Sequence, residues 1–317
     1  MIGLLHRTTF RAMGTSCTIW ATASEADRRH ARRVLASGRA EVEACERTLS
    51  RFDPSSDLSR LNDAAGKWVD VDSRLADALR LALRGRKATG GRFDPTILPA
   101  LVAAGYDRTY EELEERPGRA ASGWRAGAEV EVAPDADRAR VERGAAVDLG
   151  GVGKGYSADR VLLAMRDAWD RLPGALVDLG GDIAVWGSPP DSGPWRIAVA
   201  DPRRPGGSLG TVRIEEGGVA TSGRHARRFG AGRALHHLID PATGAPALEG
   251  PLAVTVVAPD PAWAEIHATA LAVSSLERAR VHVAGLSGVS AFWVPPIGAP
   301  EQLGVLPLEP ALVGAAA

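Results

Sequence analysis

The sequence predicts an α+β fold in which mixed and antiparallel sheets are interrupted by helices. Two observations lead to this fold class. Short runs of alternating or β-branched residues follow one another with glycine-rich turns between them, which is typical of β-hairpins. Amphipathic segments interrupt these runs at uneven intervals, without a fixed-period repeat or a regular βαβ series.

The first elements are predicted from residue spacing. Residues 10–22 alternate loosely between polar and apolar side chains, which indicates a strand. Residues 25–50 are predicted to form a helix, because apolar residues recur at spacings of three and four among arginines and glutamates. Pro54 and neighbouring serines end that helix. A short alternating strand follows at 67–72.

A second helix is predicted to start at Asp72 or Ser73, whose short polar side chains suit an N-cap. Leucines at helical spacing form its buried face, and Gly90 and Gly91 end it. The polar, charged and glycine-rich segment 107–127 is predicted to be a surface insertion.

The second half of the chain is richer in strands. One predicted helix follows the segment 147–160, with Ser157 as its N-cap, and another covers 261–275. Residues 300–317 are predicted to be a mobile tail. The predicted strands are 128–133, 143–150, a hairpin over 174–187 that turns at Gly180 and Gly181, 195–201, 210–214, 217–223, 251–259 and, as the last strand, 289–294.

Composition excludes several classes of protein. The chain has 317 residues, 45% of them hydrophobic and 24% charged, which allows one large globular domain or two smaller ones. A net charge of −1 gives no electrostatic case for binding nucleic acid. The two cysteines have no CxxC spacing, which favours a reducing compartment. No apolar window is long enough for a membrane span, and the N-terminal apolar stretch is too short for a signal peptide. We therefore expect a cytoplasmic protein.

The segment 147–160, VDLGGVGKGYSADR, is the most unusual stretch of the sequence. It is not a P-loop, because no glycine lies six residues before Lys154 and Gly155 follows where a hydroxyl residue is required. Gly153, Gly155 and Ala158 fit a dinucleotide-binding pattern, but the surrounding segments do not repeat the βαβ unit. Taken alone, the segment favours a glycine-rich turn that packs a strand against a helix.

Its neighbours in the chain point to a more specific interpretation. The series MGT, LSRFDPSSDLSRLN, GGRFDPTILP, DLGGVGKGYSAD, LVDLGGDI, VATSG, HHLIDPATG and AEIHATALAV, in this order, resembles the ApbE family of flavin transferases. The resemblance runs from about residue 10 to beyond residue 273. It implies a single catalytic unit over 1–317, made of two interleaved lobes with FAD between them.

The resemblance also implies an activity. Enzymes of this family transfer the FMN half of FAD to a threonine or serine hydroxyl of a target protein, release AMP and require Mg²⁺. Some members instead hydrolyse FAD to FMN and AMP. A third possibility is a protein that binds FAD without catalysis. The resemblance leaves a monomer or a homodimer open.

Metal-ligating residues are predicted from the family pattern. Glu265 and Thr269 match its acid and threonine, and their spacing of four places them on one face of a helix. The carbonyl of Gly151 would be the third ligand. Hard oxygen donors of this kind suit Mg²⁺. The family more often has Asp where Glu265 stands.

Two residues are predicted to act on the phosphates. His237 matches the family histidine near the reacting phosphates and could accept the proton of the target hydroxyl. His236 would face away from it, because neighbouring residues of a strand point to opposite sides. Lys154 would hold phosphate as a point charge or brace its loop. Asp240 opens a turn that fixes His237.

The remaining predicted FAD contacts allow structural alternatives. Met13 and Phe52 could instead pack in the core, and Asp94 and Thr96 could mark the start of a helix. Asp148 and Asp182 could instead hold their loops in place by hydrogen bonds. After the TSG motif the family often has an acid and a tyrosine, whereas this chain has Arg224 and His225. The predicted FAD contacts, besides Lys154 and His237, are Met13, Phe52, Asp94, Thr96, Asp148, Gly180, Gly181, Asp182, Thr221, Ser222 and Gly223.

Overall fold

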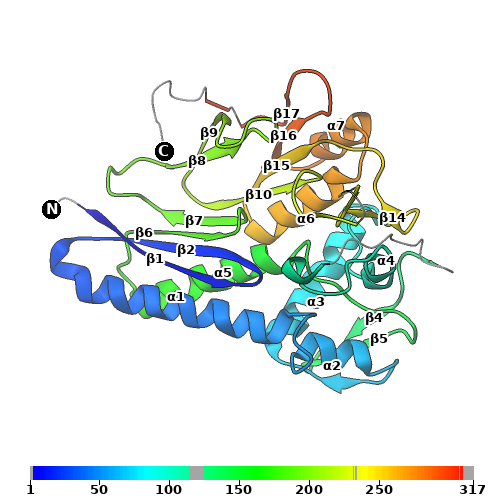
Figure 1. Cartoon of the computed structure of the whole chain (residues 1–317). Coiled ribbons are helices and arrows are strands. Elements are labelled where there is room, and N and C mark those ends of the chain that lie inside the picture. The colour runs from blue at the N-terminus through cyan, green and yellow to red at the C-terminus, as the bar shows by residue number, and fades with distance from the viewer. Residues whose placement is uncertain (1–2, 114–123, 231, 233, 307, 310–317) are drawn as a thin grey trace.

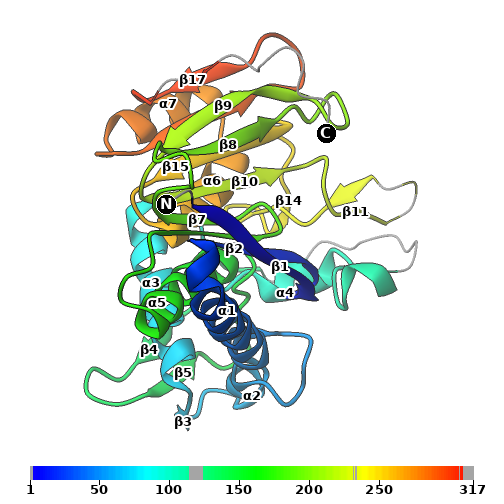
Figure 2. The same ribbon diagram turned by 90° about the vertical axis from the view of Figure 1, so that its left-hand side faces the viewer.

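The computed structural model describes residues 3–113, 124–230, 232, 234–306 and 308–309, and it confirms the α+β fold. Its centre is an eight-stranded sheet in which neighbouring strands are antiparallel (Figure 1). Strands β1 and β17 lie at opposite edges (Figure 2). In spatial order the strands are β1 (Leu4–Ala12), β2 (Thr15–Ala23), β6 (Gly174–Leu179), β7 (Ile183–Gly187), β10 (Gly217–Gly223), β15 (Ala253–Ala258), β16 (Ser290–Val294) and β17 (Glu301–Leu303).

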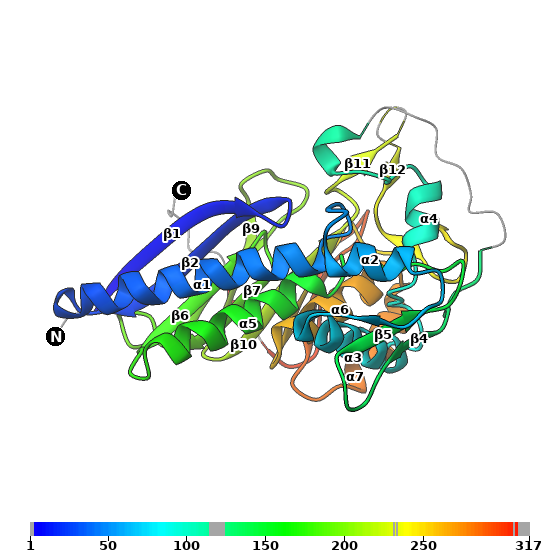
Figure 3. The same cartoon turned by 90° about the horizontal axis from the view of Figure 1, so that it is seen from below.

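Three helices cover one face of this sheet: α1 (Arg28–Leu49), α5 (Gly153–Ala168) and α6 (Pro261–Ala272). Helices α1 and α5 run side by side (Figure 3). A Cβ on Gly38 would lie only 3.1 Å from Cγ of Met165, so this glycine permits their close packing. Helix α7 (Leu276–Ala284) follows α6 and contacts β17.

The opposite face is covered by a ribbon of two strands, β8 (Trp195–Ala200) and β9 (Ser208–Ile214). Their inward side chains, including Trp195, Ile197 and Val212, pack against residues of β7, β10, β15 and β16. Because both faces are covered, β15 is buried along its whole length, as its run of β-branched residues suggests.

A smaller group of elements lies beside α6. It contains α2 (Asp57–Asp63), α3 (Ser73–Ala88) and a sheet of β3 (Val69–Asp70), β5 (Arg138–Val141) and β4 (Val130–Val132). Leucines of α2 and α3 share a hydrophobic cluster with Val147 and with Ile266 of α6. The residues just before α5 are therefore held between the two parts of the molecule.

A third cluster forms around Tyr106 and Phe229, whose rings stack 5.5 Å apart. It joins α4 (Leu98–Ala103) and the 3₁₀ turn η2 (Tyr110–Glu112) to two hairpins. The hairpin strands are β11 (Arg228–Phe229), β12 (Leu235–His236), β13 (Ile239–Asp240) and β14 (Ala245–Pro246).

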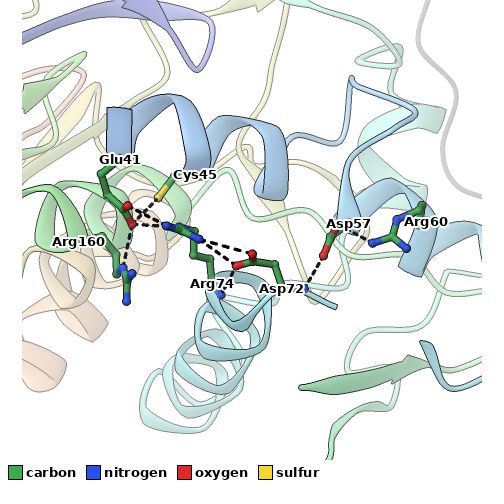
Figure 4. A network of polar contacts seen from close by, with 7 residues as sticks. All are labelled: Glu41, Cys45, Asp57, Arg60, Asp72, Arg74 and Arg160. Carbon is green, nitrogen blue, oxygen red and sulfur yellow. Dashed lines mark hydrogen bonds and ion pairs between the residues drawn. The ribbon is translucent and has the colours of Figure 1, made fainter. Parts of the chain in front are cut away.

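Buried polar contacts also hold the helices together (Figure 4). Glu41 of α1 accepts hydrogen bonds from Arg74 of α3, at 2.8 and 3.0 Å, and from Arg160 of α5, at 3.1 Å. Burial raises the pKa of Glu41, but the hydrogen bonds from Arg74 and Arg160 more than offset this, so its pKa lies below the usual value. One carboxylate therefore connects three helices.

Several predicted elements are wrong. Residues 10–22 are not one strand: the chain reverses between β1 and β2 at Met13 and Gly14, which have φ values of 52° and 66°. Residues 143–150 do not form a strand, because the amide and carbonyl of Val147 bind the Asn62 side chain instead of a strand partner. The prediction also missed α2, α7 and β17.

Helix ends give two further outcomes. Asp72 caps α3 by accepting a hydrogen bond from Arg74 N, as one of the two predicted choices. Ser157 does not cap α5, which begins at Gly153; its hydroxyl instead donates to the Gly153 carbonyl at 2.6 Å inside the helix. The serine that suggested a cap is therefore a residue inside the helix, whose hydroxyl bonds to the carbonyl four residues earlier.

Two predicted segments are described only in part. Of the segment 300–317, residues 301–303 form β17 and Glu309 pairs with Thr211, so this portion belongs to sheets and is not a tail. Residues 310–317 lie outside the described residues, as do 114–123 of the predicted insertion 107–127.

Candidate active site

The glycine-rich segment becomes the turn that leads into α5. Asp148 N donates to the Pro95 carbonyl and Gly153 N to the Leu149 carbonyl, so the backbone is fixed before the helix starts. A Cβ on Gly155 would lie 2.6 Å from the carbonyl oxygen of Pro261, so any side chain at this position would clash with that oxygen. Glycine here lets the N-terminal turn of α5 touch that of α6.

This close approach brings Lys154 to two carboxylates. Its Nζ lies 2.5 Å from Oε1 of Glu265 and also pairs with Asp182, which follows the β6–β7 turn. The amide of Gly155 donates to Oε2 of Glu265 at 2.8 Å. Both carboxylates are almost fully buried, and their net charge with Lys154 is negative.

Electrostatics follow from this burial. Burial would lower the pKa of Lys154, but Asp182 and Glu265 raise it above its ordinary value, so the side chain is an ammonium. Burial raises the pKa of Glu265, Lys154 opposes that shift and Asp182 adds to it. The net result is a pKa of Glu265 above its ordinary value, so the cluster holds one cation between two acids of which Glu265 is the more readily protonated.

The three predicted metal ligands meet beside this cluster. Glu265 and Thr269 lie one turn apart on α6, and a Cβ on Gly151 would be 2.8 Å from Oγ1 of Thr269. No group of three His, Cys, Asp or Glu side chains able to hold a metal occurs within the described ranges. The set nevertheless fits Mg²⁺ chemically, because a carboxylate, a hydroxyl and a main-chain carbonyl are all hard oxygen donors.

His237 follows β12 and lies within electrostatic reach of Lys154. Its Nδ1 is enclosed and has no hydrogen-bond partner among the residues that the structure describes. Burial, together with the positive charge of Arg227, holds the pKa of His237 well below its usual value, so the imidazole is neutral at pH 7. His236 is held elsewhere: its Nε2 lies 3.1 Å from the Ala247 carbonyl.

The turn after His237 is the predicted one. The carbonyl of Asp240 accepts hydrogen bonds from Thr243 N at 3.1 Å and Gly244 N at 2.8 Å, and its Oδ1 accepts one from Ala242 N at 2.9 Å. The Trp124 indole, from the end of the segment 107–127, donates to the Pro241 carbonyl at 2.9 Å.

Asp148 turns away from the Lys154 cluster and pairs with Arg51, whose Nε lies 2.7 Å from Oδ2. Its Oδ1 accepts a hydrogen bond from Gly150 N. The Arg51 guanidinium lies over the ring of Phe52, 4.1 Å from its centroid. Sequence reasoning missed Arg51; the only local signal was its position beside Phe52.

The tips of the β1–β2 and β6–β7 hairpins lie side by side, and the second tip leads to Asp182 of the Lys154 cluster. Gly180 has a φ of 71°, and a Cβ on it would lie 2.2 Å from Oγ1 of Thr15, next to the β1–β2 turn. The amide of Gly181 donates to Asp178 at 2.7 Å, and no atom lies within 4 Å of where its Cβ would be. Met13 at the facing turn donates its amide to Glu46 at 2.5 Å and packs on the core.

Asp94 and Thr96 are committed to their own turn. The carboxylate of Asp94 accepts hydrogen bonds from the amide and hydroxyl of Thr96, at 2.9 and 2.7 Å, and from Gly127 N at 2.6 Å. Both side chains are buried. The structure thus gives them a local role that shapes the loop beneath Gly151.

The TSG motif ends β10. Thr221 shares a hydrogen bond of 2.8 Å with Thr255 of β15, and a Cβ on Gly223 would collide with His225. Ser222 is half-buried beside them. None of the interactions found among the described residues joins these three to Lys154.

The departure from the family pattern after this motif has a structural explanation. The Arg224 guanidinium donates to three carbonyls, those of Leu248 at 2.9 Å, Gly250 at 2.6 Å and Pro251 at 3.0 Å. Arg224 therefore fixes the loop before β15, a task that an acid could not perform.

Comparison with known proteins decides the family. The sequence profile described as the ApbE family matches residues 13–293. The chain belongs to the ApbE family. Over 264 residues it is 30% identical to the FAD:protein FMN transferase of Klebsiella pneumoniae (strain 342), which covers 80% of this chain and 75% of that protein. Over 271 residues it is 31% identical to the FAD:protein FMN transferase of Treponema pallidum (strain Nichols), covering 79% and 74%.

Solved structures of ApbE proteins agree. The crystal structure of the ApbE protein from Thermotoga maritima aligns with a TM-score of 0.81 at 27% identity and covers 95% of this chain and 97% of that one. The apo flavinyl transferase ApbE of Pseudomonas stutzeri has the same fold, with a TM-score of 0.78 at 23% identity over 95% of each chain. Within the described part of this ApbE-family chain, no helix is long and apolar enough to cross a membrane.

Proposed function

We propose that this protein transfers FMN from FAD to a threonine or serine hydroxyl of a target protein and releases AMP, with Mg²⁺ bound at Glu265, Thr269 and the Gly151 carbonyl. Membership of the ApbE family supports the reaction class. The observation that carries the site is the convergence of Lys154, Glu265 and Asp182 beside Gly151 and Thr269.

A bound Mg²⁺ would neutralise negative charge on the phosphoryl oxygens. Lys154 adds a fixed positive charge, held in place by Asp182 and Glu265. The start of α5 directs the positive end of the helix dipole to the same place, where the Gly155 amide already donates to Glu265. These groups together suit a diphosphate better than a neutral ligand.

His237 is the proton acceptor of this proposal. Within the described part of the chain the Nδ1 atom of His237 has no partner, so a neutral imidazole there is free to take the proton of an incoming hydroxyl. The negative phosphates of a bound FAD would oppose the effect of burial and of Arg227 and raise the low pKa of this imidazole toward the working range. A bond then forms between the hydroxyl oxygen and the FMN phosphorus, and the bond from that phosphorus to the oxygen of AMP breaks. The released AMP carries away the electron pair.

The remaining predicted FAD contacts are assigned by position. Phe52 and Met13 would contact the rings, and Gly180 and Gly181 would allow the backbone to approach the ligand. Thr221, Ser222 and Gly223 would lie farther along the ligand on β10. Asp94, Thr96 and Asp148 would support loops, in keeping with their hydrogen bonds. A cytoplasmic location stays a prediction, supported by the two free cysteines.

Mass spectrometry of a threonine-bearing partner after incubation with FAD and Mg²⁺ tests the reaction. We expect the partner to gain the mass of FMN minus water while AMP appears in equal amount. Release of free FMN and AMP with every partner would instead establish FAD pyrophosphatase activity, and binding without turnover would establish a carrier.

Two variants test the site. Glu265→Gln should abolish Mg²⁺-dependent transfer, because a neutral amide is a poor metal ligand, while FAD binding without metal persists. His237→Ala should lower the transfer rate at least about 100-fold with a smaller change in FAD affinity. Full activity of Glu265→Gln would remove the metal assignment, and a pure loss of affinity in His237→Ala would make that residue a binding group.

A further inference from the structure

Arg51 is a buried cation with an unusual set of partners. Only 7% of its side chain is exposed. Its guanidinium lies over two rings that contact each other, 4.1 Å from the centroid of Phe52 and 4.9 Å from that of Tyr106, and donates to the Tyr106 carbonyl at 3.1 Å. Arg51 covers one face of Phe52, yet that residue is 41% exposed, so part of its ring stays open.

The same guanidinium reaches the glycine-rich turn. Its Nε contacts Oδ2 of Asp148 at 2.7 Å, and Oδ1 of Asp148 accepts the Gly150 amide at 2.8 Å. Gly151, whose backbone lies against Thr269, is the next residue. A short path of direct contacts thus runs from the Phe52 ring through Arg51 and Asp148 to the turn beside α6.

We propose that Arg51 is a positioning residue that couples the placement of a flat ring on Phe52 to the placement of the Gly150–Gly151 turn. This inference rests on the proposed function, in which the ring belongs to FAD and the turn carries a metal ligand. A planar guanidinium can lie over both rings and at the same time donate to Asp148 and to the Tyr106 carbonyl. A shift of the ring therefore moves the group that holds the turn, and the coupling is reciprocal.

The first test measures FAD binding by flavin fluorescence in the presence of EDTA, so that no metal or turnover is needed. Arg51→Met should raise the dissociation constant about tenfold and reduce the quenching of bound flavin, because Phe52 loses its backing. The matched control is Arg39→Met, since Arg39 also pairs with an acid, Glu43 at 2.8 Å, and lies over a ring, Phe10 at 5.0 Å, but on the outer side of α1. It should bind FAD within twofold of the wild type.

The second test is a double-mutant cycle. Asp148→Asn should also weaken FAD binding, and the variant carrying both changes should be no weaker than the worse single variant, because the two side chains act as one unit. Independent roles would make the two effects multiply, which would overturn the coupling. Equal FAD affinity in Arg51→Met and Arg39→Met would overturn the role of Arg51 itself.

Arg51→Lys keeps the test decisive where Arg51→Met fails to fold. Lysine preserves the charge opposite Asp148 but lacks the planar group that lies over the two rings. We expect KM for FAD to rise about fivefold with kcat within twofold of the wild type, and an unchanged KM would contradict the proposal. A wild-type protein that binds no FAD would defeat the proposed function, whereas normal wild-type transfer with unaffected Arg51 variants would defeat only this inference.

Discussion

Gly155 is the residue at which two helices of the site come closest. Its missing side chain leaves room for the Pro261 carbonyl, which a Cβ would approach to 2.6 Å. Because the obstacle is backbone, it cannot move aside without displacing α6 and with it Glu265. Adding one methyl group at Gly155 therefore tests whether the close contact between α5 and α6 is needed for stability and activity.

We expect Gly155→Ala to destabilise the fold by about 2 kcal/mol or more, as is typical of overpacking, and to lower transfer activity further. Urea denaturation and FAD turnover measure the two effects. Gly153→Ala is the control, because its Cβ would meet nothing closer than 3.6 Å. Equal stability of the two variants would show that α5 and α6 are not in rigid contact here.

Asp159 of α5 provides a prediction of pH dependence. Burial, with a further contribution from Asp260, raises the pKa of Asp159 to about 7 from its usual 3.8. The folded state therefore binds a proton that the unfolded state lacks between these values, so stability falls as pH rises through this window.

Asp159→Asn should remove the loss of stability that ionisation of Asp159 causes as pH rises. The variant should match the wild type below about pH 4 and gain about 2 kcal/mol by pH 8, an amount reduced from the full shift because Asp159 is only half-buried. Thermal denaturation over this pH range measures the difference. Asp167→Asn, an exposed change on the same helix, should show no such trend.

The resemblance to the family singled out Glu265 and Thr269, and their spacing of four adds only that they share one face of a helix. Other residues of the site had no such signal. Arg51 binds Asp148 and the Tyr106 carbonyl, which are distant in the sequence, and no periodicity reports such contacts. Asp182 was predicted, but its pairing with Lys154 depends on how the β6–β7 turn meets α5.

At the scale of the elements, the Glu41 network holds α1, α3 and α5 in place (Figure 4). Its carboxylate is only 11% exposed, and removing its charge leaves the partly exposed Arg74 and Arg160 without their shared acid, although Arg74 keeps an ion pair with Asp72 at 3.3 Å. Glu41→Gln should therefore cost about 2 kcal/mol of stability at pH 7, less than the loss of a fully buried ion pair.

The pH dependence of this variant has the opposite sign to that of Asp159→Asn. Since the pKa of Glu41 is lowered, its contribution is complete above the unfolded value of 4.5 and is lost as pH falls below it. The wild type and Glu41→Gln should therefore converge in acid, as urea denaturation at pH 7 and pH 3 would reveal. Glu43→Gln, which breaks only an exposed pair with Arg39, should change stability by less than about 1 kcal/mol.

Elements were predictable where pattern and length agreed. The long helix α1 and the buried strand β15 follow from apolar spacing and β-branched residues. The β1–β2 hairpin was missed because its turn uses Met13 in the left-handed region, where a non-glycine residue is uncommon. The 143–150 segment looked like a strand because buried residues alternate there, but an asparagine side chain supplies its hydrogen bonds.

On the scale of the whole molecule, the site is assembled from separate clusters. Lys154, His237 and Arg51 belong to elements that pack in different hydrophobic clusters or between them. A ligand that contacts all three should oppose their separation. FAD at 100 times its dissociation constant should add about 2.7 kcal/mol to the stability of the fold, or several degrees in Tm.

Differential scanning fluorimetry can measure this effect. Riboflavin, which has the ring but no phosphates, should give a smaller shift than FAD at equal concentration. The same shift from both ligands would mean that the Lys154 cluster does not contact the diphosphate.

The ion pairs of Lys154 also affect the order of folding, metal binding and substrate binding. The chain brings its own cation to Glu265 and Asp182, so one of the two acidic charges is balanced as soon as the polypeptide folds. Folding should therefore be indifferent to chelators, in contrast to proteins whose metal sites consist of uncompensated acids. A divalent cation meets a carboxylate that is already engaged and gains full affinity only when a diphosphate adds negative charge. Calorimetric titration should show weak Mg²⁺ binding to the empty protein and tight binding with FAD, so that metal and substrate enter and leave together.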